Sequence, residues 1–297
     1  MANNEPCEPA HKRKPDWIRI RVPGGDGFKK ISDILKYNKL YTICEEGRCP
    51  NRGECWTLGE ATFLILGNTC TRSCRFCAVN KAKEGSPLRQ NEGEAIANAA
   101  REMGLSYVVL SSVDRDDLKD RGAGQFASCI KALRGLPHIK IEVLIPDYSL
   151  KELKPIMESP PDVVAHNIEV PRPLQWIRDS RSSFDKSLAT LREAKEAFLF
   201  TGKNRLITKS SILLGLGEEK KDVLSAMDEL RLAGVDILVL GQYLQPTHKE
   251  LKVISYISPS QFEEYKKAAL ERGFGAVIAS PLARTSYHAG KSYHECL

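Results

Sequence analysis

The sequence predicts an α/β fold, a partial (β/α)6 barrel of the TIM type with a cysteine-rich N-terminal extension and a C-terminal tail. Short apolar runs alternate with helical patterns, which indicates βα units and a parallel sheet. Six or seven such units occupy about 220 residues, and no G-x-G-x-x-G motif follows the first strand, so a barrel fits better than two dinucleotide-binding halves. We expect an N-terminal extension over residues 1–60, the barrel over 61–280 and a C-terminal segment over 281–297.

The composition is that of an ordinary globular chain. It has 297 residues, of which 42% are hydrophobic and 28% are charged. No apolar run approaches the ~18 residues that cross a bilayer, and the first twenty residues contain no apolar signal region, so we expect a cytoplasmic protein without a membrane partner. Lys and Arg exceed Asp and Glu by six (44 − 38), which is too small an excess to indicate nucleic-acid binding.

The predicted elements follow one another in a regular order. A basic segment broken by Pro and Gly opens the chain, and a short helix over 32–39 follows it, with Ser32 as its N-cap. Residues 44–60 contain Gly and Pro at close intervals, so we expect a loop whose order comes from what it binds. From residue 61 onward, apolar runs predict seven strands at 61–66, 107–110, 139–145, 163–168, 206–214, 236–240 and 276–279.

Helical patterns fill most of the intervals between these strands. Phe126, Cys129, Ile130 and Leu133 occupy positions i, i+3, i+4 and i+7, which indicates one apolar face of a helix and places Cys129 in the core. Similar spacings recur in three other intervals, at Ile96, Ala99 and Met103, at Val223, Met227 and Leu230, and at Phe262, Tyr265 and Ala269.

Six of the nine cysteines lie between residues 44 and 77, in two groups of three. The first triad, C-x4-C-x5-C, is Cys44, Cys49 and Cys55, and the second triad, C-x3-C-x2-C, is Cys70, Cys74 and Cys77. Each triad is one thiolate short of a four-ligand site, and an iron–sulfur cluster held by three cysteines leaves one iron open for chemistry. Structural zinc usually needs four ligands, so a zinc-binding interaction module is the less favoured interpretation.

The second triad directly follows the first predicted strand, where barrel enzymes carry their chemistry. With Phe76 before its last cysteine, it resembles the cluster motif of the radical S-adenosylmethionine (SAM) superfamily. The resemblance implies a [4Fe–4S] cluster whose open iron binds SAM. It also implies that one electron cleaves SAM to methionine and a 5′-deoxyadenosyl radical, which removes hydrogen from unactivated carbon.

The same resemblance suggests residues that bind SAM. Gly215, Gly217 and Glu218 follow the fifth predicted strand and resemble the glycine-containing segment where the superfamily's backbone approaches SAM. Asn167 and Glu169 end the fourth strand, where side chains can hydrogen-bond the ribose or the methionine amine.

Three further charged residues are candidates for the same pocket. Arg178 can pair with a carboxylate as a bidentate fork. Asp114 and Asp117 either contribute to this pocket or cap the helix that follows them.

The first triad, together with Arg284-Thr-Ser286-Tyr287 near the C-terminus, resembles the lipoyl synthase family. The match runs over residues 14–290 and includes the segments 14–17, 44–51, 62–67, 113–118, 166–169, 245–247 and 286–289. The resemblance implies an auxiliary [4Fe–4S] cluster on Cys44, Cys49 and Cys55, whose fourth ligand is Ser286, with Thr285 as the alternative. Serine is a hard oxygen ligand for iron, so this corner should open first, which suits a cluster that gives up its own sulfide.

The implied reaction is insertion of two sulfur atoms, at C6 and C8, into an octanoyl chain linked to a lysine of a carrier protein, at the expense of two SAM molecules. The clusters and SAM carry the chemistry, so no side chain is expected to act as an acid or base. The implied partners are an octanoylated lipoyl carrier (the glycine cleavage H protein or a lipoyl domain of a 2-oxoacid dehydrogenase) and an electron donor such as flavodoxin or ferredoxin. Arg19, Arg21 and Lys29 are candidate contacts for an acidic carrier. A radical SAM enzyme that inserts sulfur into another substrate is the alternative.

Overall fold

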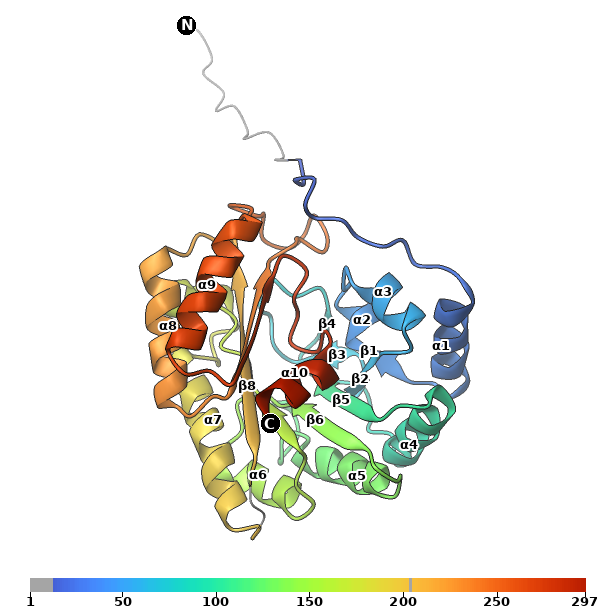
Figure 1. Cartoon of the computed structure of the whole chain (residues 1–297). Coiled ribbons are helices and arrows are strands. Elements are labelled where there is room, and N and C mark those ends of the chain that lie inside the picture. Colours follow the sequence, from blue (N-terminus) through green and yellow to red (C-terminus); the bar gives the residue numbers. More distant parts are fainter. Residues whose placement is uncertain (1–12, 203–204) are drawn as a thin grey trace, which may run out of the picture.

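Seven parallel strands lie side by side in chain order and form one curved sheet (Figure 1). They are β2 (Thr62–Ile65), β5 (Tyr107–Ser112), β6 (Lys140–Leu144), β7 (Val163–Ala165), β8 (Ile207–Leu214), β9 (Ile237–Gln242) and β10 (Ala276–Ser280). A short strand, β1 (Tyr41–Thr42), pairs antiparallel with β2 at one edge. The structure is a computed structural model that describes residues 13–202 and 205–297.

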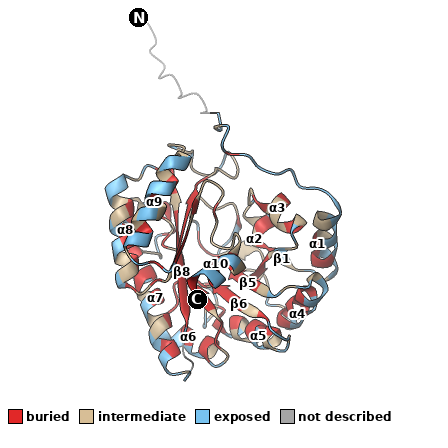
Figure 2. Cartoon of the chain, viewed as in Figure 1, coloured by how far each residue is buried: buried red, intermediate tan, exposed pale blue. Residues whose placement is uncertain are grey.

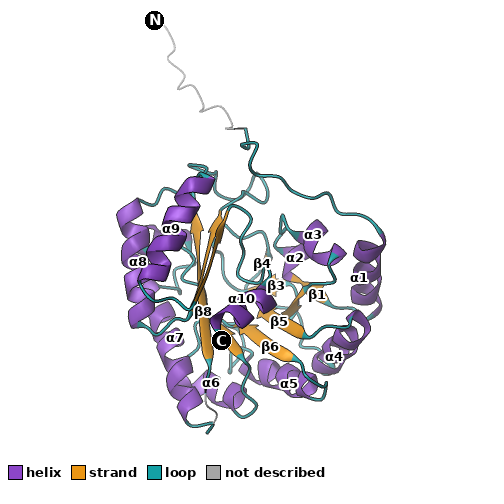
Figure 3. Ribbon diagram, in the orientation of Figure 1, coloured by secondary structure: helices purple, strands orange, loops and turns teal. Residues whose placement is uncertain are grey.

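Six helices connect these strands and cover the outer face of the sheet, as Figure 3 shows. They are α4 (Glu92–Met103), α5 (Ala123–Arg134), α6 (Leu150–Met157), α7 (Phe184–Leu199), α8 (Lys220–Leu232) and α9 (Pro259–Glu271). The sheet runs from β1 to β10 without closing, so the prediction of a partial (β/α)6 barrel is confirmed. Within the described residues, no helix is both long enough and apolar enough to cross a membrane.

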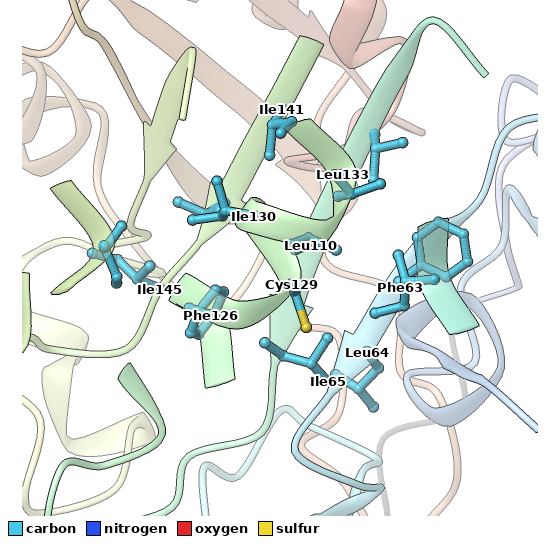
Figure 4. Close-up of a cluster of buried hydrophobic side chains, with 14 of the residues drawn as sticks. Phe63, Leu64, Ile65, Leu110, Phe126, Cys129, Ile130, Leu133, Ile141 and Ile145 are labelled. Atoms are coloured by element: carbon cyan, nitrogen blue, oxygen red, sulfur yellow. The ribbon is translucent and has the colours of Figure 1, made fainter. Parts of the chain in front are cut away.

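The main core lies between the helices and the sheet, where Figure 2 shows buried strands and half-buried helices. In Figure 4, Phe126, Cys129, Ile130 and Leu133 of α5 lie beside strand residues such as Leu110. All five are fully buried. The helical spacing predicted for α5 is therefore correct, and Cys129 is a core residue.

The inside of the barrel also contains a buried polar group. Side chains along a strand alternate between its two faces, and Ser211 of β8 lines the cavity described below, so Lys209 also points inward, one layer deeper. The Lys209 Nζ lies 3.1 Å from both carboxylate oxygens of Glu142, and the Tyr107 hydroxyl donates to the same carboxylate at 2.7 Å. Lys209 and Glu142 have no exposed surface.

The N-terminal extension differs from the prediction. Helix α1 (Asp26–Tyr37) begins after Gly25, whose φ is 87°, so Ser32 lies in the middle of the helix and is not its cap. The predicted loop over 44–60 was wrong, because it contains most of α2 (Ile43–Glu46) and all of α3 (Arg52–Thr57). Trp56 of α3 is 1% exposed and its ring centroid lies 5.0 Å from that of Phe28, so this segment packs onto α1.

The C-terminal segment also has more structure than the predicted tail. It ends in α10 (Ala289–Cys296), which lies across the gap between the two halves of the sheet in Figure 1. Tyr293 and Cys296 are buried against the first residues of several strands, including Val163 and Ile207. Helix α10 therefore covers the amino-terminal mouth of the barrel.

Candidate functional site

A cavity of about 340 Å³ opens at the carboxyl end of the sheet. Residues from the ends of β8 and β9 and from the loops after β2, β5, β6, β7 and β10 line it. Five of the six clustered cysteines are among the lining residues, namely Cys44, Cys49, Cys70, Cys74 and Cys77, and Cys55 is not. The fold therefore brings both triads to one cavity, at the place where barrel enzymes bind their substrates.

The second triad lies in a loop held by a small pair of strands, β3 (Thr69–Cys70) and β4 (Asn80–Lys81). The backbone N–H groups of Arg72 and Asp114 both donate to the Cys70 sulfur at 3.4 Å, and that of Asp179 donates to the Cys74 sulfur at 3.3 Å. Such N–H···S bonds stabilise thiolate ligands and tune the reduction potential of an iron–sulfur cluster.

Arg72 connects this loop to the barrel. Its buried guanidinium donates to Asp116 at 2.9 Å, to Ser182 at 2.9 Å and also to Asp147. The neighbouring Ser73 donates its backbone N–H to Asp179 at 2.8 Å. Loops after β5, β6 and β7 thus fix the position of the second triad.

The charges around Arg72 are well compensated. Burial alone would raise the pKa of Asp147, but His166, Arg72 and Arg178 hold that pKa well below its usual range. A hydrogen bond from the Arg181 side chain likewise lowers the pKa of Asp179. These carboxylates are therefore ionised partners of the arginines at neutral pH.

The thiols themselves are in apolar surroundings. Burial, and then the neighbouring Cys49, raise the pKa of Cys44 to about 11, and burial raises that of Cys74 to about 12. Burial, followed by Asp114, raises the pKa of Cys70 to about 11. Such thiols stay protonated at neutral pH and are poor nucleophiles. A positively charged metal group that binds them would displace their protons.

The C-terminal motif reaches the same cavity. Arg284, Thr285 and Ser286 all line it. The Thr285 hydroxyl is already engaged, since it donates to Ser211 Oγ at 3.0 Å and accepts from the Asn167 amide at 3.0 Å. Within the described residues, the Ser286 hydroxyl has no hydrogen-bond partner.

Two of the residues predicted to bind SAM meet at the cavity wall. The Asn167 amide donates to Glu169 Oε1 at 3.1 Å, and Glu169 has a φ of 64°, which turns the chain sharply after β7. Burial raises the pKa of Glu169, against the opposing effects of Arg178 and Asn167.

Arg178 also lines the cavity, but protein groups take up its donors. It donates to Ser187 Oγ at 2.9 Å and to Gln175 Oε1 at 3.1 Å, and the carboxylate beside it, at 3.5 Å, is that of Asp147. Arg178 is thus positioned to support the loops. The carboxylate that it faces belongs to Asp147 of the protein, whereas the sequence suggests a carboxylate of the ligand.

The glycine segment after β8 does not reach the lining. Gly215, Gly217 and Glu218 are absent from the cavity wall. Glu218 instead accepts the backbone N–H of Gly215 at 2.6 Å. Gly215 has a φ of 94°, and a Cβ atom there would lie 2.1 Å from the Gln242 amide nitrogen. In this structure the glycine is required by packing against Gln242.

Asp114 and Asp117 do not cap the following helix, so that prediction was wrong. Asp114 lines the cavity, 3.3 Å from Arg72, and Asp117 pairs with Arg115 at 2.8 Å. Helix α5 begins later, and Asp120 accepts the N–H groups at its start. Arg72 and Asp147 were not anticipated, because nothing in the sequence marks a charged residue as buried.

The donor set fits iron–sulfur clusters better than a single ion. All eight cysteines in the described ranges are free thiols. Over the same ranges, no group of three His, Cys, Asp or Glu residues is close enough to hold one metal ion, which the zinc alternative requires. Three sulfurs around a cubane lie farther apart than three sulfurs on one ion, and thiolates are the usual ligands of such clusters.

Comparisons with known proteins agree on one family. Residues 64–230 match the model of the radical SAM superfamily, and residues 3–49 match the N-terminal domain of lipoyl synthase of that family. Lipoyl synthase of Methanocella arvoryzae is 44% identical over 284 residues, covering 94% of each chain. Lipoyl synthase of Geobacillus sp. (strain WCH70) is 46% identical over 295 residues, covering 97% of this chain and 95% of the relative.

Solved structures share the fold at low sequence identity. Methylornithine synthase aligns with a TM-score of 0.54 and 14% identity, covering 84% of this chain and 81% of that one. The FeFe-hydrogenase maturase HydG from Carboxydothermus hydrogenoformans aligns with a TM-score of 0.55 and 19% identity, covering 90% of this chain and 69% of that one. These likenesses support the partial barrel.

Proposed function

The chain belongs to the lipoyl synthase family of radical SAM enzymes, and from this premise we propose how its residues hold the groups that the family uses. The reaction is insertion of two sulfur atoms, at C6 and C8, into a protein-bound octanoyl-lysine. When bound, SAM and two [4Fe–4S] clusters supply the hydrogen abstraction and the sulfur. The chain's own residues bind, orient and shield these groups.

We assign the SAM-binding cluster to Cys70, Cys74 and Cys77. The assignment is supported by the backbone N–H groups aimed at the Cys70 and Cys74 sulfurs and by the buried Arg72, which fixes the loop. Asn167 and Glu169 are proposed to bind SAM, since both line the cavity. Contact of SAM with Gly215, Gly217 and Glu218 stays a prediction. Their turn would have to move for these residues to reach the cavity. Arg178 is proposed to hold the loops in place.

We assign the auxiliary cluster to Cys44, Cys49, Cys55 and Ser286. The observation that carries this choice is the contrast between two neighbouring hydroxyls at the cavity. That of Thr285 is bonded to Asn167 and Ser211, whereas that of Ser286 has no partner among the described residues and is available to a metal. In this scheme residues 1–60 carry three ligands of the auxiliary cluster, residues 61–280 form the barrel, and residues 281–297 supply the fourth ligand.

The substrate is a lipoyl carrier protein, and we propose an acidic H protein or lipoyl domain as its specific form. Arg19, Arg21 and Lys29 are all exposed on the N-terminal extension and suit such a partner. The reducing conditions that the clusters need favour a cytoplasmic enzyme.

A flavodoxin or ferredoxin is the proposed electron donor. Arg75, Lys81 and Lys252 are exposed around the loop of the second triad, and no carboxylate in the described residues pairs with them. Arg75 also stacks over the exposed ring of Trp176, 5.1 Å from its centroid. A basic surface beside the cluster loop suits an acidic one-electron carrier.

The test of this scheme is anaerobic reconstitution followed by reaction with an octanoyl-lysyl peptide, SAM and dithionite. We expect about eight irons per chain from two cubanes and a peptide that gains two sulfur atoms by mass spectrometry. Cys74→Ala should abolish SAM cleavage, whereas Cys49→Ala should still form 5′-deoxyadenosine without thiolated product. Cys129→Ala, in the core outside both triads, is the matched control and should keep its iron. Sulfur insertion by Cys49→Ala would contradict the assignment.

A second pair of variants separates the two hydroxyls. Ser286→Ala should lose sulfur insertion and keep SAM cleavage, and Thr285→Val should keep its auxiliary iron because its hydroxyl is engaged elsewhere. Ser286→Cys should bind the auxiliary cluster through four thiolates and release no sulfur. Loss of auxiliary iron in Thr285→Val but not in Ser286→Ala would move the ligand to Thr285.

A further inference from the structure

Two segments far apart in the sequence meet beside the first triad, and side chains join them. The buried Asn51 amide donates to the Leu282 carbonyl at 2.6 Å. The Tyr287 hydroxyl donates to Glu54 Oε1 at 2.9 Å. The His288 ring lies 3.7 Å from Glu54 and 3.5 Å from Glu60. These contacts lie on both sides of Ser286 along the chain.

The N-terminal half of this arrangement is held by protein contacts alone. The Asn51 carbonyl accepts the N–H groups of Glu54 and Cys55 at 3.0 and 2.9 Å, so the two anchoring side chains lie in one turn. The adjacent Trp56 is buried against Phe28, and the Arg52 guanidinium covers both rings at 5.6 and 5.8 Å. None of these contacts involves a cysteine sulfur.

The C-terminal half is likewise anchored beyond Ser286. Helix α10 begins three residues later, and its Tyr293 and Cys296 are buried against the bases of the strands. The Tyr287 ring also lies 4.0 Å from that of His288. Ser286 is thus held between an anchored helix and an anchored turn.

We propose that Asn51, Glu54 and Tyr287 form a latch that keeps Ser286 beside the first triad whether or not its oxygen is bonded to iron. The proposal rests on Ser286 as the auxiliary ligand. If the segment around Ser286 stays docked, it does not have to be ordered again whenever the Ser286 oxygen returns to the iron. The entropy of closing the loop has then been lost already. The latch residues are positioning residues, and none of the three lines the cavity.

Hydrogen exchange of the full chain prepared without clusters tests the latch directly. We expect the amides of Ala283 and Tyr287, which donate to the Ser280 and Arg284 carbonyls, to be protected before any cluster is present. Tyr287→Phe, which removes one hydroxyl that bonds to a carboxylate, should speed their exchange about tenfold. Tyr37→Phe makes the same chemical change at a residue that is 83% exposed on α1 and should have no effect. Unprotected amides in the unaltered chain, or unchanged exchange in Tyr287→Phe, would overturn the proposal.

Loaded protein provides a second readout. Tyr287→Phe should bind both clusters, but a chelator should remove its auxiliary iron about tenfold faster while the iron of the second triad leaves at the normal rate. If Tyr287→Phe does not fold, Glu54→Gln serves instead, since it keeps the acceptor's shape and weakens the bond by removing its charge.

The proposal that Ser286 is a ligand and the proposal of the latch fail separately. Sulfur insertion by Ser286→Ala with faster exchange in Tyr287→Phe rejects the ligand but keeps the latch, and the converse rejects the latch alone.

Discussion

The buried pair of Lys209 and Glu142 makes a quantitative prediction about stability. Both side chains are completely buried inside the barrel, below the cavity, and the Tyr107 hydroxyl completes the group. Lys209→Met removes the positive charge and leaves the carboxylate buried without its ionic partner. We expect this change to lower the free energy of unfolding by about 3–5 kcal/mol, the usual effect of breaking a buried ion pair.

Removing both charges should cost less than removing one. In Lys209→Met/Glu142→Leu neither charge of the pair remains, and the chief defect is the Tyr107 hydroxyl without an acceptor. An unsatisfied buried hydroxyl costs about 1–3 kcal/mol. Adding Tyr107→Phe removes that defect too, so the triple variant should lie within about 1 kcal/mol of the unaltered chain, since apolar replacements of buried ion pairs are often neutral.

Urea unfolding of the full chain without clusters, followed by circular dichroism, measures these differences. Variants with equal m-values can be compared through their midpoints. The expected order of stability is the triple variant, then the double variant, then Lys209→Met. A double variant that is as unstable as Lys209→Met, or a loss below about 1 kcal/mol in Lys209→Met, would contradict the electrostatic argument.

Three further predictions concern the loops and the pH response. Arg72→Gln removes the buried cation that Asp116 and Asp147 share, so the reconstituted protein should hold about four irons instead of eight, counted by a colorimetric iron assay. Gly122 has a φ of 88° and a Cβ atom there would lie 2.3 Å from the Leu66 side chain, so Gly122→Ala should cost about 1–3 kcal/mol in urea unfolding, more than Gly104→Ala, whose Cβ would meet open space. The pKa values of Asp116, Asp147 and Asp179 are lowered, so these three carboxylates stabilise the fold above the unfolded pKa of 3.8 and lose this effect as pH falls through their folded pKa values. The urea midpoint should therefore drop as pH falls below about 4, and a constant midpoint would contradict the pairing.

The sequence was most informative where one physical signal dominates over several residues. All seven parallel strands lie where apolar runs predict them, because a strand with helices on one face and barrel side chains on the other is largely apolar. The stripe of Phe126, Cys129, Ile130 and Leu133 was equally clear. Helices α2 and α3, with four and six residues, are too short to show a helical period, so the sequence predicts a loop there.

Buried charges were the part that the sequence could not supply. A lysine in a strand is ordinarily taken as exposed, and the partner that makes its burial possible, Glu142, is 67 residues away. Arg72 poses the same problem, since its partners Asp116, Asp147 and Ser182 come from loops after three different strands. The contrast between Thr285 and Ser286 depends in turn on where Asn167 and Ser211 lie, which only the folded barrel determines.

The topology explains why residues from opposite ends of the chain meet. In a sheet ordered from β1 to β10 that does not close, the first and last strands form its two free edges. The extension before β2 and the segment after β10 therefore enter the same gap, where Asn51 bonds to Leu282 and Glu54 to Tyr287. A closed barrel would pair these edges through backbone hydrogen bonds and leave no opening for the two segments. The open edge is thus what allows Cys44 and Cys49 near the start and Ser286 near the end to share a cavity wall.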